Sequence, residues 1–433
     1  MKDIKEHTNI VIILIDTLRN DYSGFLKKYL LKIGFIPLEN TISPAPWTPP
    51  SHASIFTGFY PLRHGIHVKR NKFSLSAFRL THYLRKRTIP FILRRRYGYE
   101  CYLFTANPYI SQFYGYNSDI FDHIFEYDPI GLFNSKKLFK KILTRINPLI
   151  KYAYYKSINW PTEKGVTTFL KLLKEIKFSK PSFIFLNLME VHPPYFIFDN
   201  YYRNLIINLK RSYLNKKYIK KWKIKYHEQV YYVSKRVLYL LKILREKKMF
   251  KNSLIIITSD HGQLLGEYNR MDHGTFLYDQ LLRVPFLVKL PETIEKSIFK
   301  DYFKKVKVNI YKYLSLTKVK HLVLSIVERD TKNLFDRLYS DMVFAESHGV
   351  HVPIRKFSDP QEEKIFCFLN KYRIAMYYRD LKVIFNVNDW KIEKIFSYKQ
   401  KVENIHNKEL DVIKAYILNF IRRNTTTSVN LKI

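Results

Sequence analysis

The stretch NIVIILIDT, residues 9–17, is an apolar run rich in β-branched residues that ends at the carboxylate of Asp16. Such an uninterrupted run predicts a strand that is buried on both faces, as strands of a parallel sheet are. A second run, SLIIITSDHG at residues 253–262, has the same form and ends at Asp260 and His261. Because ligands of α/β folds gather where strands end, the two runs predict acidic ligands at one edge of a sheet.

The same pattern predicts further elements of this sheet. We expect strands at residues 100–105, 181–188 and 284–289, and a helix at 230–247 whose apolar residues follow helical spacing. The expected fold class is α/β, a three-layer sandwich with a mostly parallel central sheet. Glu190 and His192 follow the strand at 181–188, so they should join the acidic residues at the same edge.

The chain is expected to divide into two domains. Residues 1–330 form the large α/β domain, and residues 331–433 form a small α+β subdomain. The subdomain is expected to hold strands at 373–378, 382–386 and 391–397 and a closing helix at 410–423. Two basic segments rich in Tyr and Asn, near 130–165 and 196–225, are predicted insertions over the sheet edge that could form a lid.

Composition narrows the class of protein. The 433 residues are 46% hydrophobic, which favours a folded globule, and the formal net charge is +38. That charge favours anionic partners such as phosphorylated or sulfated substrates or an acidic membrane surface. The alternative explanation is a general compositional bias, because Lys, Ile, Tyr, Phe and Asn are all abundant. Nucleic acid is an unlikely partner because no reading motif is present.

The cysteines and the N-terminal residues help to predict the cellular compartment of the protein. Cys101 and Cys367 support neither a disulfide framework nor a zinc site made of cysteines. We expect no secretory leader because residues 1–9 have no apolar h-region, and no stretch approaches the roughly 20 apolar residues that span a bilayer. We therefore expect a cytoplasmic protein, with peripheral attachment to a membrane as an option.

Thr48 lies between the two acidic strands, in the Pro-rich segment APWTPPSHAS at residues 45–54. A hydroxyl on a rigid turn, together with acidic ligands from two strands, indicates a nucleophile assisted by a metal ion. The chemistry that this arrangement predicts is attack on a phosphate or sulfate ester.

These segments resemble the sulfatase family of the alkaline phosphatase superfamily. The matching stretches, in order, are residues 15–21, 48–58, 60–65, 259–262 and 277–285. The resemblance implies that Asp16, Thr48, Asp260 and His261 ligate a divalent cation, with one or two ions in the site. Asp and His suit Zn or Mn, whereas Ca or Mg remain possible but would prefer a site made of oxygen ligands.

The chain departs from typical sulfatases at the nucleophile. Those enzymes carry a Cys that matures to formylglycine where Thr48 stands, and an Arg where His52 stands. Threonine cannot become formylglycine, so Thr48 is expected to attack directly and to form a phospho- or sulfo-threonine. This route resembles that of the phosphodiesterases and phosphoethanolamine transferases of the superfamily. Thr17 also replaces a second Asp that many sulfatases use for their metal.

Four other side chains have expected roles in this resemblance. His192 is a candidate catalytic residue that protonates the leaving group, and His273 stands where sulfatases usually carry a Lys. The two histidines could grip the ester oxygens, which we favour, or form a second metal site with Glu190. Asn107 either binds the ester oxygens or makes a turn before Pro108, and His52 either orients Thr48 or caps its helix.

Three functions follow from these residues. The leading hypothesis is a sulfatase-like, metal-dependent hydrolase of sulfate or phosphate esters. An alternative is a phosphodiesterase or phosphotransferase that acts on lipid-headgroup or glycan phosphates. The third is a catalytically silent basic binding protein that retains the fold.

Overall fold

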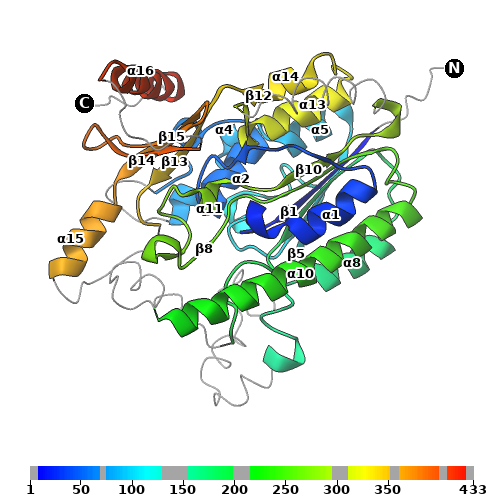
Figure 1. Cartoon of the computed structure of the whole chain (residues 1–433). Coiled ribbons are helices and arrows are strands. Elements are labelled where there is room, and N and C mark those ends of the chain that lie inside the picture. Colours follow the sequence, from blue (N-terminus) through cyan, green and yellow to red (C-terminus); the bar gives the residue numbers. More distant parts are fainter. Residues whose placement is uncertain are drawn as a thin grey trace.

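The computed structural model of the chain describes residues 8–68, 75–128, 155–197, 215–294, 311–351, 360–398 and 407–425 (Figure 1). Within these residues, a seven-stranded sheet has helices packed on both faces, and a separate four-stranded sheet follows near the C-terminus. The predicted three-layer α/β sandwich is therefore confirmed.

The large sheet is mostly parallel. Its strands lie in the order β2 (Ile36–Pro37), β10 (Phe286–Lys289), β7 (Ser253–Thr258), β1 (Asn9–Ile15), β6 (Ser182–Leu188), β4 (Glu100–Thr105) and β5 (His123–Glu126). The five strands from β7 to β5 are parallel, whereas β10 runs antiparallel to β7 and β2 runs antiparallel to β10. All five predicted strands are present, but the short edge strands β2 and β5 were missed because they carry little apolar pattern.

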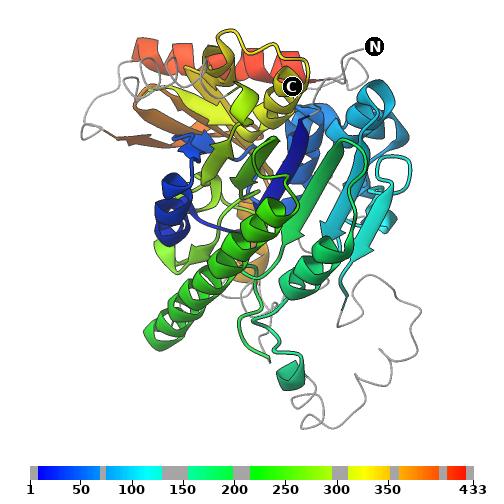
Figure 2. The same cartoon turned by 90° about the vertical axis from the view of Figure 1, so that its right-hand side faces the viewer.

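Side chains of the central strand β1 alternate between two apolar layers, as strand geometry requires. Ile10, Ile12 and Leu14 face the layer of α2 (Thr48–Thr57), α5 (Ile89–Tyr97) and α13 (Val319–Val327). The other apolar residues of the strand face the layer of α1 (Gly24–Lys32), α8 (Val166–Glu175) and α10 (Lys216–Glu246), of which Figure 2 shows the long α10 lying across the sheet. Burial on both faces explains why the strand sequences are apolar throughout.

Helix α10 corrects one prediction. It begins at Lys216, not at residue 230, so the last part of the predicted insertion at 196–225 belongs to this helix. Trp222 and Tyr226 are fully buried and continue the apolar stripe of Val230 at a spacing of four residues. The surrounding lysines hid this stripe in the sequence pattern. Residues 130–154 and 198–214 of the two predicted insertions lie outside the described residues.

The C-terminal part forms an antiparallel sheet covered by a helix. Its strands are β13 (Met342–His348), β14 (Tyr372–Tyr378), β15 (Leu381–Asn386) and β16 (Lys391–Ser397). Helix α16 (Asn407–Asn424) packs against it through apolar residues that include Ile413, Ile417 and Phe420 (Figure 1). The three predicted strands and the closing helix are confirmed, whereas β13 was not predicted.

A small third sheet links the N-terminal and C-terminal portions of the chain. Its strands are β3 (Thr41–Ile42), β11 (Tyr313–Ser315) and β12 (Tyr339–Ser340). Because β12 lies beyond residue 330 and pairs with β11, the division into domains at that residue stays a prediction. None of the helices in the described ranges has the length and apolar character needed to cross a bilayer.

Candidate active site

The predicted site residues follow four neighbouring parallel strands. Asp16 follows β1, His192 lies four residues after the end of β6, Asn107 follows β4, and Asp260 follows β7. Because β7, β1, β6 and β4 are adjacent and parallel, the loops after them emerge side by side at one edge of the sheet. This topology brings together residues that are far apart in the chain.

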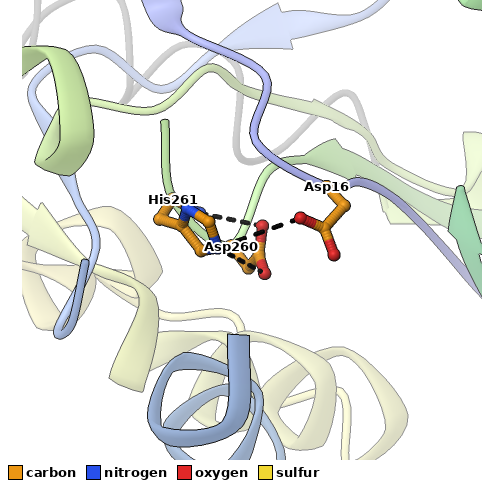
Figure 3. Close-up of side chains that lie close together, drawn as sticks. All are labelled: Asp16, Asp260 and His261. Carbon is orange, nitrogen blue, oxygen red and sulfur yellow. Dashed lines mark hydrogen bonds and ion pairs between the residues drawn. The ribbon is translucent and has the colours of Figure 1, made fainter. Parts of the chain in front are cut away.

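Asp16, Asp260 and His261 form a compact cluster (Figure 3). All three side chains are fully buried, and one ligand atom from each lies within 4.8 Å of the others. His261 Nε2 is 3.4 Å from Asp260 Oδ2 and 3.8 Å from Asp16 Oδ1. Among the described residues, this is the single group of three or more His, Cys, Asp or Glu side chains placed to hold a metal ion.

The electrostatics of this cluster fit a divalent cation. Asp16 Oδ1 and Asp260 Oδ2 are buried and have no hydrogen-bond partner, which is costly for carboxylate oxygens. Burial raises the pKa of both carboxyls to about 7, and for Asp16 the negative charge of Asp260 raises it further. A cation would satisfy both orphaned oxygens, and two carboxylates with an imidazole are a donor set that suits Zn or Mn.

The protonation of the His261 ring also suits the binding of a metal ion. Its Nδ1 lies 2.9 Å from the carbonyl oxygen of Gly262, so the proton is assigned to Nδ1 and is donated to that carbonyl. The lone pair on Nε2 then faces the two carboxylates, and such fixing of the outer nitrogen is typical of metal-binding histidines.

Thr48 meets the same cluster. It is the first residue of α2, it follows the extended residue Trp47, and the prolines after it are compatible with the first helical turn. Thr48 Oγ1 lies 3.3 Å from His261 Nε2 and 3.4 Å from Asp16 Oδ2. The fourth predicted ligand therefore lies beside the other three, at a helix N-terminus that favours negative charge.

Hydroxyl groups tie the first turn of α2 to the strand end that carries Asp260. Ser51 Oγ donates to the carbonyl oxygen of Asp260 at 2.6 Å, and Ser43 Oγ donates to the same carbonyl. The two serine hydroxyls also lie 2.9 Å apart. This network fixes the position of Thr48 relative to the metal ligands.

His52 lies one turn behind Thr48 and is fully buried. Its Nδ1 is 3.2 Å from the carbonyl oxygen of Thr48 and 3.5 Å from Asp260 Oδ2, and its Nε2 accepts from Asn187 Nδ2 at 3.4 Å. Burial lowers the pKa of His52 to about 3, so the ring is neutral. The predicted orienting role agrees with these contacts, whereas direct contact with substrate does not agree with an enclosed ring.

Asn107 contacts the cluster through its side chain, whereas Thr17 contacts it through its backbone nitrogen, which donates to Asp260 Oδ1 at 3.3 Å. Asn107 Nδ2 donates to Asp16 Oδ2 at 2.8 Å, while its Oδ1 accepts from the backbone of Tyr109 at 2.9 Å. The residue thus makes the predicted turn and also directs its amide into the site. Thr17 has a left-handed backbone, φ 62°, and its hydroxyl donates to the carbonyl oxygen of Asp16 at 2.7 Å. Its side chain is engaged with the backbone rather than with the cluster.

His273 lies between His192 and His261. Its ring centre is 5.1 Å from that of His192 and 4.7 Å from that of His261. His273 Nδ1 is 2.7 Å from Gln263 Oε1 and 2.8 Å from Asp272 Oδ1, so this nitrogen carries the proton and Nε2 is an acceptor. Burial lowers the pKa of His192 and of His273 well below the usual value, and both rings are neutral.

Glu190 does not belong to this group. Its Oε1 accepts from the backbone nitrogens of Lys164 at 3.1 Å and Val166 at 3.0 Å, at the start of α8. The alternative in which Glu190, His192 and His273 bind a second cation is therefore not assembled within the described residues.

Four residues of the site were not predicted: Asn187, Gln263, Asp272 and His351. Asn187 is a polar residue inside the apolar strand β6, and Gln263 follows the Asp-His-Gly segment directly, so both offered a signal in the sequence. His351 comes from the region after β13, and its ring stacks on that of His273 at 5.8 Å. No local sequence pattern predicts that His351 belongs to the site, because only the folded chain brings it there.

Comparisons with known proteins point to one family. The family model described as Sulfatase matches residues 8–317. An arylsulfatase of Clostridium perfringens (strain 13 / Type A) is 26% identical over 161 residues, which are 32% of this chain and 33% of the relative. An N-acetylglucosamine-6-sulfatase of Capra hircus is 24% identical over 323 residues, which are 65% of this chain and 56% of the relative. The chain thus spans about a third of the first relative and just over half of the second.

Among solved structures, a phosphonate monoester hydrolase from Silicibacter pomeroyi is similar to this chain with a TM-score of 0.67. The two share 15% identity, and the match covers 98% of this chain and 97% of that one. At this identity the likeness concerns the fold.

Proposed function

We propose, from the premise that this chain belongs to the sulfatase family of the alkaline phosphatase superfamily, that it hydrolyses sulfate or phosphate esters with Thr48 as its nucleophile. The observation that carries the proposal is the position of Thr48 Oγ1, 3.3 Å from His261 Nε2 and 3.4 Å from Asp16 Oδ2. A hydroxyl beside a donor set of two carboxylates and an imidazole has the placement that an activated nucleophile needs.

Asp16, Asp260, His261 and Thr48 would hold the cation, for which Zn or Mn is the best match. When bound, it would lower the pKa of the threonine hydroxyl and balance the charge of the ester oxygens. The N-terminus of α2 adds its own partial positive charge where the alkoxide forms.

The chemical step uses Thr48 directly. Its hydroxyl proton passes to solvent, and Oγ1 attacks the sulfur or phosphorus atom and forms a new bond to it, while the bond to the leaving oxygen breaks and its electron pair stays with that oxygen. Water then attacks the same atom of the threonine ester, so that sulfate or phosphate is released and Thr48 regains its proton.

His192 and His273 handle protons and charge in this proposal. Each rests as a neutral ring whose Nδ1 donates to a protein oxygen, so Nε2 must take up a proton before it can release one. We assign to His192 the transfer of a proton to the leaving oxygen. His273 stands beside Asp272, at 2.8 Å, and gains a proton when an anionic ester enters, after which it grips the ester oxygens.

A phosphate ester is the better match to the nucleophile, although the curated relatives are named as sulfatases. Threonine has no route to formylglycine, and a threonine ester is cleaved by direct attack of water or of another acceptor. The second candidate function is therefore a phosphodiesterase or phosphotransferase that acts on lipid-headgroup or glycan phosphates.

One assay separates these functions from a catalytically silent binding protein. The protein is freed of metal with a chelator, supplied with Mn²⁺ or Zn²⁺, and tested on p-nitrophenyl sulfate, p-nitrophenyl phosphate and bis(p-nitrophenyl) phosphate. We expect turnover that depends on metal and is lost in Asp260→Asn. The control Asp411→Asn removes a carboxylate that is exposed on α16 and should match the unmodified protein. Absence of turnover on all three esters with bound metal would favour the silent protein.

A further inference from the structure

A cavity of about 420 Å³ lies at the junction between α16 and the rest of the chain. It is lined by residues of α16, by β12 and β13, by the 3-10 helix η6 (Leu316–Lys318) and by Tyr60, which precedes α3 (Pro61–His64). We call it the α16 pocket. It shares no residue with the candidate active site, and its volume is within the range of small-molecule sites.

The charged side chains that line the α16 pocket are all positive. Lys318 and Arg423 line it from opposite elements, and no acidic residue is among its lining residues. Within the described part of the chain, neither side chain makes a hydrogen bond or an ion pair. Two cations that face one cavity without a counter-ion create a positive potential, which an anion would relieve.

The hydroxyl groups of Tyr60, Ser315 and Thr317 form one part of the lining, which we call the floor. Thr317 Oγ1 donates to Ser315 Oγ at 3.0 Å, and the phenol oxygen of Tyr60 accepts from the backbone nitrogen of Phe344 at 3.5 Å. Hydroxyls can both donate and accept, so this floor can pair with the hydroxyls of a polyol.

Aromatic side chains form another part of the lining, which we call the wall. The rings of Phe344 and Phe420 stack with centres 4.1 Å apart, and Tyr60 meets Phe420 edge to face at 5.0 Å. Tyr416 extends this wall from α16. Such a wall offers an apolar face to a saturated ring, while the cations lie beside it.

We propose that the α16 pocket binds a monosaccharide-sized phosphate or sulfate ester. The anionic group lies between Lys318 and Arg423, and the sugar ring lies against Phe420 and Tyr416 with its hydroxyls towards Ser315. Arg423 can bind the anion through two parallel N–H groups, whereas Lys318 acts as a point charge. This proposal is independent of the chemistry at Thr48.

Calorimetric titration of the full chain tests the proposal. Glucose 6-phosphate and glucose 6-sulfate are titrated into metal-free protein, with inorganic phosphate, inorganic sulfate and glucose titrated separately. We expect each ester to bind, and Arg423→Gln and Lys318→Gln each to weaken that binding about tenfold, since each removes one charged contact. Melting temperatures of the variants establish that they fold.

Arg422→Gln is the matched control. Arg422 and Arg423 are neighbouring exposed cations on the same helix, but Arg422 does not line the cavity. Its loss should change the affinity less than twofold. Equal weakening by Arg422→Gln, or no binding of either ester up to millimolar concentration, would overturn the site. Free phosphate or sulfate that binds as tightly as its ester would overturn the role of the ring.

Discussion

Replacement of Thr48 by alanine tests the proposed nucleophile most directly. The change removes the hydroxyl that lies 3.3 Å from His261 Nε2 and leaves both carboxylates in place. Loss of an enzyme's nucleophile lowers kcat by roughly 10⁴-fold or more, equivalent to about 5 kcal/mol of transition-state stabilisation.

The cost to folding should be much smaller. The contacts of Thr48 Oγ1 with Asp16 and His261 are 3.3 Å or longer, so they are weak hydrogen bonds. Together with one buried methyl group, their loss should lower the free energy of unfolding by about 1–2 kcal/mol. A large fall in kcat with a small fall in melting temperature therefore separates a chemical role from a structural one.

Two further variants sharpen this experiment. Thr48→Ser keeps the hydroxyl and should retain kcat within about tenfold, because only the constraint of the β-methyl group on the side-chain rotamer is lost. Thr57→Ala is the matched control, since Thr57 is buried in the same helix and its hydroxyl donates to the carbonyl oxygen of Ala53 at 2.6 Å. It should lower stability but leave kcat unchanged.

The assay is initial-rate hydrolysis of the best p-nitrophenyl ester at saturating metal, with metal content measured for each variant. Mass spectrometry of acid-quenched protein should find the phosphate or sulfate on the peptide that contains Thr48. Retention of more than a tenth of the kcat in Thr48→Ala would refute the assignment.

Four other predictions follow from the site and its surroundings. Metal affinity should fall as pH drops below about 7, because protons compete for Asp16 and Asp260, whose pKa values burial raises to about 7; chelator competition across pH measures this. The stability of the metal-free protein should change with pH in the opposite direction, because the pKa values of both carboxyls lie above the ordinary 3.8. The stability that the protonated pair contributes is full below about pH 4 and is lost as pH rises through about 7. Chemical denaturation at each pH would detect this loss. His273→Gln should lower kcat roughly 10²-fold or more without loss of bound metal, and unchanged kcat would exclude its role. Tyr226→Phe should lower the free energy of unfolding by about 1–3 kcal/mol, because the buried phenol bridges the backbone of residues 17 and 19. Tyr239 is exposed on the same helix, so Tyr239→Phe should have little effect in the same denaturation assay.

The strands and the candidate metal ligands Asp16, Asp260 and His261 were predictable from local sequence. Residues 9–15 and 253–258 are short, apolar and β-branched, and this composition fits only strands that are covered on both faces. Since functional loops of α/β folds follow such strands, the acidic residues directly after them were identifiable as candidate ligands before any pairing was known. Three of the four C-terminal strands were also predicted from short strand-like segments, whereas β13 was not.

Tertiary structure decided the rest, because pairing and side-chain direction depend on contacts between distant segments. The antiparallel course of β10 and the use of Glu190 by the start of α8 leave no mark in their local sequences. The same holds for His351, which reaches His273 only because the segment after β13 returns to the edge of the large sheet. Local pattern records how a residue is buried, whereas packing of the whole chain determines which neighbour it meets.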